Sequence, residues 1–163
     1  MGFTTARMTL IYHTPLTRED LRAQNVPDSW PFGIADRVHY GDLDTNSHVN
    51  NAVYLKWFEN IRVQYFQAWD ILKFQAGEPR VVLKSLAVEY HKEMFMNEDY
   101  VVAARTASFR NTSFRQEYAV YSGDLRVTGQ AVIVMLQPDA PEKMALPDAL
   151  KQRFIQVDGA TAG

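Results

Sequence analysis

One strongly helical segment, followed by a run of strand-like segments, constrains the fold of this chain more than any other feature. Apolar residues recur at three- and four-residue spacing from Tyr54 to Leu72, which is typical of an α-helix. The apolar surface is wider than one stripe, so we expect this helix to be buried in most directions. Asn50 or Asn51 is the expected N-cap, and the helix is predicted to end near Lys73.

Segments rich in β-branched residues follow Pro79, and short polar breaks separate them. They span residues 81–92, 100–109, 114–121 and 127–136. Short connections indicate hairpins and therefore an antiparallel sheet. A further strand is expected at 35–40 and a short helix at 147–154. One central helix with such a sheet predicts an α+β fold in which the sheet wraps around the helix.

The first thirty residues differ in character from the rest. We expect residues 1–30 to form an arm that leads into a single domain of residues 31–163. Thr17 is predicted to cap a short helix in this arm, with Asp20 three positions on. The length of 163 residues is typical of one domain.

Composition excludes several classes of function. The chain has no cysteine, so disulfides, thiolate metal ligands and a cysteine nucleophile are excluded. The net charge of −2 lacks the basic balance of a nucleic-acid-binding protein. No apolar run approaches the roughly 18 residues of a membrane span, and none near the N-terminus is long enough for a signal peptide. We therefore expect a cytoplasmic protein with no nucleic-acid partner and no membrane span.

The chemically richest window directly precedes the predicted helix. Asp42, Asp44, Asn46 and His48 lie within seven residues of a turn-rich loop. A helix N-terminus presents unpaired N–H groups and the positive end of the helix dipole, which together polarise a carbonyl oxygen. A nearby carboxylate is then able to attack the carbonyl carbon or to activate a water.

Less specific interpretations of this window also exist. Asp, Asn and Ser before a helix are usually turn and cap residues, and Asp42 fits that role best. A lone histidine such as His48 is more often structural than catalytic. A metal site of Asp42, Asp44 and His48 is a further alternative, but the glycine and distal glutamate of an EF-hand loop are missing.

The ten residues from Asp42 to Asn51 read D-L-D-T-N-S-H-V-N-N, and Tyr54, Trp57, Glu59 and Arg62 follow them. This pattern closely resembles the signature of hot-dog acyl thioesterases, including the 4-hydroxybenzoyl-CoA thioesterase-like group. It looks still more like that of the plant acyl-carrier-protein (ACP) thioesterases. The order of elements from about residue 35 to 137 is similar too. The resemblance implies a hot-dog fold, an antiparallel sheet wrapped around a long central helix.

The resemblance also implies catalytic roles. Asp44 matches the catalytic carboxylate, as nucleophile or general base, and Asn46 and His48 match the residues that accompany it. Glu93 falls on a catalytic glutamate of the plant branch. Strand alternation groups Glu93 with outward-facing neighbours, so a bulge, or a site formed across a dimer, is expected if Glu93 is to reach the site. The next position, a cysteine in many relatives, is Met94 here.

Substrate-binding roles follow from the same resemblance. Ser47 stands where many bacterial members have glycine, and the turn after residue 109 resembles the segment that lines the thioester or pantetheine path. Arg110 is a candidate ligand for a coenzyme A (CoA) phosphate. The implied substrate-binding residues are Ser47, Val49, Asn51 and Tyr54 beside the helix, and Arg110, Thr112, Ser113 and Phe114 in the later turn.

These residues predict an acyl thioesterase that hydrolyses an acyl-CoA or acyl-ACP thioester to free acid and thiol. Such hydrolysis needs a carboxylate, an oxyanion hole and water, so no metal and no cofactor are expected. Two alternatives are a hot-dog dehydratase and a non-catalytic acyl-thioester-binding protein. A dehydratase would take its histidine and acid from different elements, whereas Asp44 and His48 share one loop. A pure binder would not need Asp44, Asn46 and His48.

Assembly is predicted from the sheet. A single helix leaves much of the sheet and its edges uncovered, and edge-to-edge pairing relieves both problems. We therefore expect a homodimer or a dimer of dimers with the site near the subunit boundary.

Overall fold

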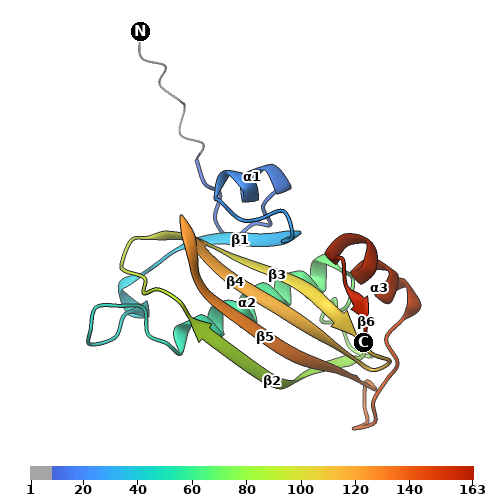
Figure 1. Ribbon diagram of the computed structural model, residues 1–163. Helices are drawn as coiled ribbons and strands as arrows, with labels where there is room; N and C mark the ends of the chain where they lie inside the picture. Colours follow the sequence, from blue (N-terminus) through green and yellow to red (C-terminus); the bar gives the residue numbers. More distant parts are fainter. Residues whose placement is uncertain (1–8) are drawn as a thin grey trace.

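A curved antiparallel sheet wraps around one long helix in the computed structural model, which describes residues 9–163 (Figure 1). The helix is α2 (Val53–Ala68). The main strands are β1 (Phe32–Arg37), β2 (Arg80–Tyr90), β3 (Asp99–Phe109), β4 (Ser113–Ser122) and β5 (Asp124–Leu136). They lie in the order β1-β3-β4-β5-β2, and the short β6 (Thr161–Ala162) pairs in parallel with β3. The predicted α+β hot-dog fold is confirmed.

The helix packs closely on the inner face of the sheet. Its buried side chains are Tyr54, Trp57, Phe58, Ile61, Tyr65 and Phe66. Gly129 of β5 permits the close approach, because a Cβ at this position would meet the Phe58 ring at 2.8 Å. The core therefore requires glycine directly beneath the first half of α2.

The predicted end of this helix, near Lys73, is wrong. The helix stops at Ala68, and Asp70 adopts a left-handed φ of 55° that turns the chain. Ile71 and Leu72 remain buried although they are no longer helical. Burial in a loop produces the same apolar spacing as burial on a helix face, which is why the pattern continued beyond the true end.

The start of the helix also differs in detail from the prediction. Ala52, with helical backbone angles, occupies the N-cap position and makes no side-chain cap. The Asn50 side chain instead accepts a hydrogen bond from the Ala52 amide at 2.9 Å. One of the two predicted asparagines thus organises the turn that leads into the helix.

The first strand is displaced from its predicted place. The expected strand at 35–40 lies at 32–37, because the chain leaves the sheet after Arg37 and forms a 3-10 turn, η1 (Tyr40–Asp42). The expected terminal helix is α3 (Asp148–Arg153). It continues into a π-helical turn, η2 (Phe154–Asp158), which the sequence did not predict.

The N-terminal segment packs on the face of the sheet opposite α2. Its helix α1 (Arg18–Ala23) carries the predicted capping box of Thr17 and Asp20. Leu21 joins a second small core with Val101 and Ala103, which alternate along β3 with residues that face α2. Of the expected arm, residues 1–8 lie outside the described residues.

The two sheet edges differ. Residues 9–16 run along β1, where His13 donates its backbone N–H to Ala35 at 3.0 Å. The outer edge of β2 pairs with no other strand of residues 9–163, and Leu83 and Tyr90 on this strand are 45% and 49% exposed. Within the same residues, no helix is both long and apolar enough to cross a membrane.

Candidate active site

The predicted catalytic window forms a loop, residues 39–52, between β1 and α2 at one end of the sheet. Asp42 begins it as a turn residue, since its Oδ2 accepts a hydrogen bond from the His39 amide at 2.8 Å. The Asn50 amide then bonds back to the Asp42 carbonyl at 2.8 Å. The structure thus supports the interpretation of Asp42 as a residue that shapes the loop.

Asp44 uses one carboxylate oxygen to hold this loop together. Its Oδ1 accepts hydrogen bonds from the amides of Asn46 at 2.8 Å and His48 at 3.4 Å. Its own amide donates to the His48 carbonyl at 2.8 Å. The Oδ2 atom has no hydrogen-bond partner within residues 9–163, and the side chain is half-buried. One oxygen of a firmly positioned carboxylate is therefore available to a substrate.

Ser47 has a backbone conformation that glycine adopts more readily. Its φ is 60°, in the left-handed region that glycine adopts readily and that costs other residues free energy. The local backbone therefore has the conformation that glycine favours, with serine in place.

The side chains of Asn46 and His48 make few contacts with the protein. Asn46 is exposed. The His48 ring packs edge-on against Phe95, with 5.0 Å between ring centroids. Neither ring nitrogen of His48 has a hydrogen-bond partner in the described part of the chain. His48 is thus not held as an internally bonded structural histidine.

Glu93 reaches the neighbourhood of this loop by a different route from the one predicted. The chain leaves the sheet after Tyr90, so strand alternation does not govern Glu93 and the predicted bulge is absent there. The Val49 amide donates to the Met94 carbonyl at 2.9 Å, which ties the two segments together. The Glu93 side chain is exposed beside the loop that carries Asp44.

Sequence reasoning missed the residue that holds the Glu93 segment in place. Arg126 of β5 is only 7% exposed and donates to the Glu93 carbonyl at 2.8 Å. It also forms ion pairs with Glu98 at 2.9 Å and Asp124 at 2.6 Å. Hydrogen bonds from Lys92 and Arg126 lower the pKa of Asp124 to about 2. The available signal was a lone arginine in an apolar strand, two residues after an aspartate.

Aromatic residues line the start of α2. Tyr54 meets the rings of Trp57 and Tyr90 edge-on, and the Tyr90 hydroxyl donates to the Asn51 carbonyl at 2.8 Å. Burial raises the pKa of Tyr54 to about 12, so its phenol stays neutral at physiological pH. These contacts hold the beginning of the helix against the end of β2.

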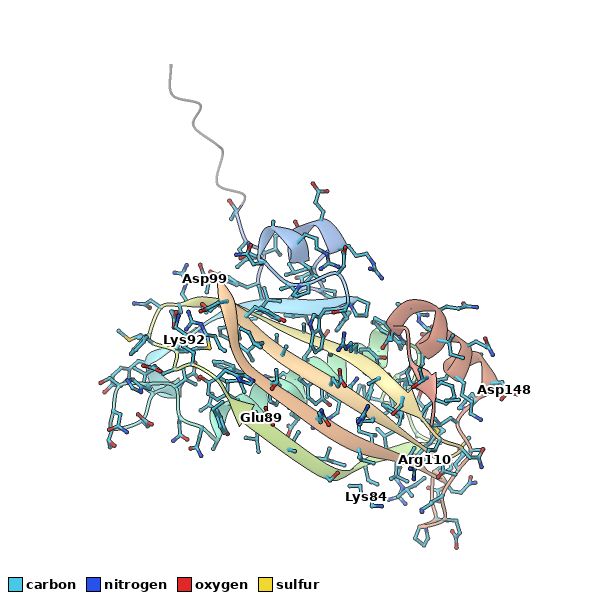
Figure 2. All side chains as sticks on the ribbon, viewed as in Figure 1. Lys84, Glu89, Lys92, Asp99, Arg110 and Asp148 are labelled. Carbon is cyan, nitrogen blue, oxygen red and sulfur yellow. The ribbon has the colours of Figure 1, made fainter. Side chains whose placement is uncertain are left out.

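The structure separates the two groups of predicted substrate-binding residues. Arg110 and Thr112 lie in the turn between β3 and β4, Ser113 begins β4, and Phe114 is buried in the core. In Figure 2, Arg110 and Lys84 are at one end of the sheet, whereas Lys92 and Asp99 are at the other. The eleven residues of β3 span about 36 Å between these ends. Within one chain, Arg110 and Asp44 do not meet.

A basic cleft of about 650 Å³ surrounds this turn. Its walls carry four cationic side chains, Lys84, Arg110, Arg115 and Lys143, together with Ser85, Ser108, Asn111, Thr112 and Ser113. No acidic residue lines it, and none of the four cations forms an ion pair within residues 9–163. The cleft therefore has the charge and the hydrogen-bond donors to bind a phosphate-bearing ligand. Nowhere in those residues do three or more His, Asp or Glu side chains gather into a metal-binding group.

Comparisons with known proteins agree with this geometry. Residues 38–154 match the model of the thioesterase-like superfamily, and the chain belongs to that family. A thioesterase-superfamily protein from Jannaschia sp. CCS1 is 40% identical, with a TM-score of 0.90, over 95% of this chain and 100% of that one. A thioesterase from Thermus thermophilus, solved in complex with CoA and Zn, is 28% identical with a TM-score of 0.70. The match covers 82% of this chain and 98% of that one. The Bacillus subtilis protein YsmA is 20% identical over 83% of this chain and 93% of its own length.

Proposed function

We propose that this protein hydrolyses an acyl-CoA thioester to free acid and CoA, with Asp44 as the reacting carboxylate. The observation that carries the proposal is the Asp44 side chain, which has one oxygen bonded into the loop and the other without a hydrogen-bond partner within residues 9–163. Membership of the thioesterase-like superfamily supports thioester hydrolysis as the reaction class.

The chemistry follows from the position of Asp44 just before a helix of 16 residues. The amides of Ala52, Val53 and Leu55 already donate to Asn50 and Ala52, so it is the positive end of the helix dipole that stabilises negative charge on the thioester oxygen. Asp44 either attacks the carbonyl carbon, giving an anhydride that water cleaves, or removes a proton from an attacking water. In both routes the carbon–sulfur bond breaks and the thiolate takes up a proton. Asn46, His48 and Glu93 are proposed to orient the thioester and the water.

The basic cleft favours CoA as the carrier. CoA carries a pyrophosphate and a 3′-phosphate, which unpaired arginine and lysine side chains recognise well. The Thermus thermophilus relative, which was solved with CoA bound, adds support. The phosphopantetheine arm of an acyl carrier protein offers a single phosphodiester, so it makes less use of four cations.

A dimer would bring the separated parts together. We propose that two copies pair through the free edges of β2, in antiparallel orientation, so that one copy's Asp44 loop lies near its partner's basic cleft. The apolar side chains of Leu83 and Tyr90 on this strand would then be covered.

The test is thiol release measured with matched substrates. Wild-type protein is expected to hydrolyse acyl-CoA faster than acyl-ACP. Replacing Arg110 and Arg115 together by alanine should raise KM for acyl-CoA by about tenfold or more, because charge-assisted hydrogen bonds are lost. KM for the matching acyl-pantetheine, which lacks the phosphates, should not change. Absence of thiol release from every substrate would contradict the proposed reaction, and an equal KM change for both substrates would contradict the proposed role of the cleft.

A further inference from the structure

We infer that the acyl group occupies an apolar cleft between α2 and the neighbouring strands β1 and β3, and that this cleft limits the length of the chain accepted. The inference rests on the proposed function. The cleft has a volume of about 250 Å³, and Ile34, Trp57, Ile61, Gln64, Tyr100 and Val102 form much of its lining.

The floor of the cleft comes from two paired strands. Ile34 of β1 lies opposite Val102 of β3, and Asp36 lies opposite Tyr100. The wall comes from one stripe of α2, in which Trp57, Ile61 and Gln64 succeed one another at helical spacing. Ile34 is half-buried, and Asn60 and Gln64 of α2 line the cleft together with it.

The near end of the cleft adjoins the catalytic loop. Trp57 stacks on Tyr100, with 4.0 Å between ring centroids. Asp36, which lines the cleft and lies opposite Tyr100, has its Oδ1 atom 3.7 Å from Nε2 of His39, the first residue of the catalytic loop. The His39 amide donates to Asp42, two residues before Asp44, so a chain that leaves a thioester at Asp44 would enter the cleft at this end.

The far end is blocked by aromatic rings. Beyond Gln64, Phe32 contacts Tyr65 and Trp69 edge-on at centroid distances of 5.9 and 5.2 Å. The helix rises about 10 Å between Trp57 and Gln64. This length suits a medium-length aliphatic chain, and a longer chain would meet the aromatic block.

The N-terminal segment completes the cleft on the open side of β1. His13 lines the cleft, and its Nε2 pairs with the Asp36 carboxylate at 2.9 Å. Two larger cavities in the described part of the chain suit an acyl chain less well. One is the basic cleft, and the other, on the opposite face of the sheet, is lined by the Arg105–Glu117 ion pair.

The experiment changes the volume of the cleft at Ile34, which lies outside the catalytic loop and the basic cleft. Ile34→Phe should lower kcat/KM for the longest acyl-CoA that the wild-type protein hydrolyses efficiently by about tenfold, since the larger ring displaces roughly two methylene groups of the acyl chain from the cleft. Hydrolysis of acetyl-CoA should change less than about twofold. Ile34→Ala should shift the optimum to longer chains. Leu136→Phe, a matched gain in volume at a half-buried strand position far from the cleft, should leave the profile unchanged.

The alternative results overturn the inference. If Ile34→Phe lowers the rate equally for all chain lengths, the cleft does not hold the acyl group. A binding measurement separates this inference from the proposed reaction, because it needs no turnover. Wild-type protein and Leu136→Phe should bind a free medium-chain fatty acid in calorimetry, and Ile34→Phe should not. Absence of binding to wild-type protein, or equal binding to all three, would overturn the inference whether or not thioesters are hydrolysed.

Discussion

At the scale of single residues, Ser47 holds a backbone conformation that is unusual for a residue other than glycine. Its left-handed φ of 60° would be easier for glycine, which has no Cβ to clash with the backbone. The neighbouring amides of Asn46 and His48 are held by Asp44, so the loop keeps this conformation with serine in place.

Substitutions at Ser47 should follow backbone strain. Ser47→Gly is expected to change the free energy of unfolding by less than about 1 kcal/mol, because relief of strain and extra freedom of the unfolded chain oppose each other. Ser47→Val should destabilise by about 1–2 kcal/mol, since a β-branched side chain tolerates this conformation poorly. Urea denaturation measures both values. A valine variant as stable as the glycine variant would contradict the assigned backbone geometry.

Residue-scale chemistry was predictable wherever it was local. The capping box of Thr17 and Asp20 and the turn role of Asp42 depend on neighbours within three residues, and both are found. The surroundings of Glu93 were not predictable from strand alternation, because alternation ends where the strand ends. That end depends on hydrogen bonds to Arg126, which is distant in sequence.

At the scale of elements, spacing located each main strand and the central helix but misjudged the ends of α2. Apolar residues after Trp69 serve the core from a loop, and spacing alone cannot distinguish this from another helical turn. The π-helical turn at the C-terminus had no sequence signal. Its Asp158 is held from distant elements by Thr106, at 2.6 Å, and by Tyr65 and Trp69.

This C-terminal element should make stability depend on pH. Burial raises the pKa of Asp158 to about 6, although three donors face the carboxylate. The unfolded pKa is about 3.9, so between pH 4 and 6 the folded state binds more protons than the unfolded state. The contribution of Asp158 to the free energy of unfolding therefore falls as pH rises, by up to about 3 kcal/mol.

Denaturant unfolding at several pH values, compared between wild-type protein and Asp158→Asn, measures this contribution. The stability difference between the two proteins should shift in favour of the variant as pH rises from 4 to 7. Parallel stability curves over that range would show that Asp158 does not titrate as proposed.

At the scale of the whole molecule, the arrangement of two separated groups was not visible in the sequence. The resemblance placed the loop around Asp44 and the turn around Arg110 in one site, but β3 holds them at opposite ends of the sheet (Figure 2). The sequence predicted that the sheet would have an uncovered edge, because one helix does not cover such a sheet, and the structure places that edge at β2. Which parts of the site this edge brings together depends on the three-dimensional positions of Asp44 and Arg110.

Mixing two defective proteins tests the proposed shared site. Asp44→Asn lacks the reacting carboxylate, and the variant with Arg110 and Arg115 both replaced by alanine lacks the basic cleft. Each alone should turn over acyl-CoA poorly. In a mixed dimer, the intact Asp44 of one copy meets the intact cleft of the other, so co-refolding should restore activity. Purely additive activity of the mixture, or a monomer in light scattering at micromolar concentration, would argue against a site shared between copies.

The most direct measurement compares acyl-CoA turnover of Asp44→Asn with that of Asp42→Asn. Asparagine retains an oxygen that accepts the Asn46 and His48 amides, so Asp44→Asn should keep its free energy of unfolding within about 1 kcal/mol of wild type. The amide is neither a nucleophile nor a base, so turnover should fall on the order of 10² to 10⁴-fold or more. Asp42→Asn retains the turn bond to His39 and should lose far less. Near-normal turnover of Asp44→Asn, or an equal loss in both variants, would contradict the assignment of Asp44 as the reacting carboxylate.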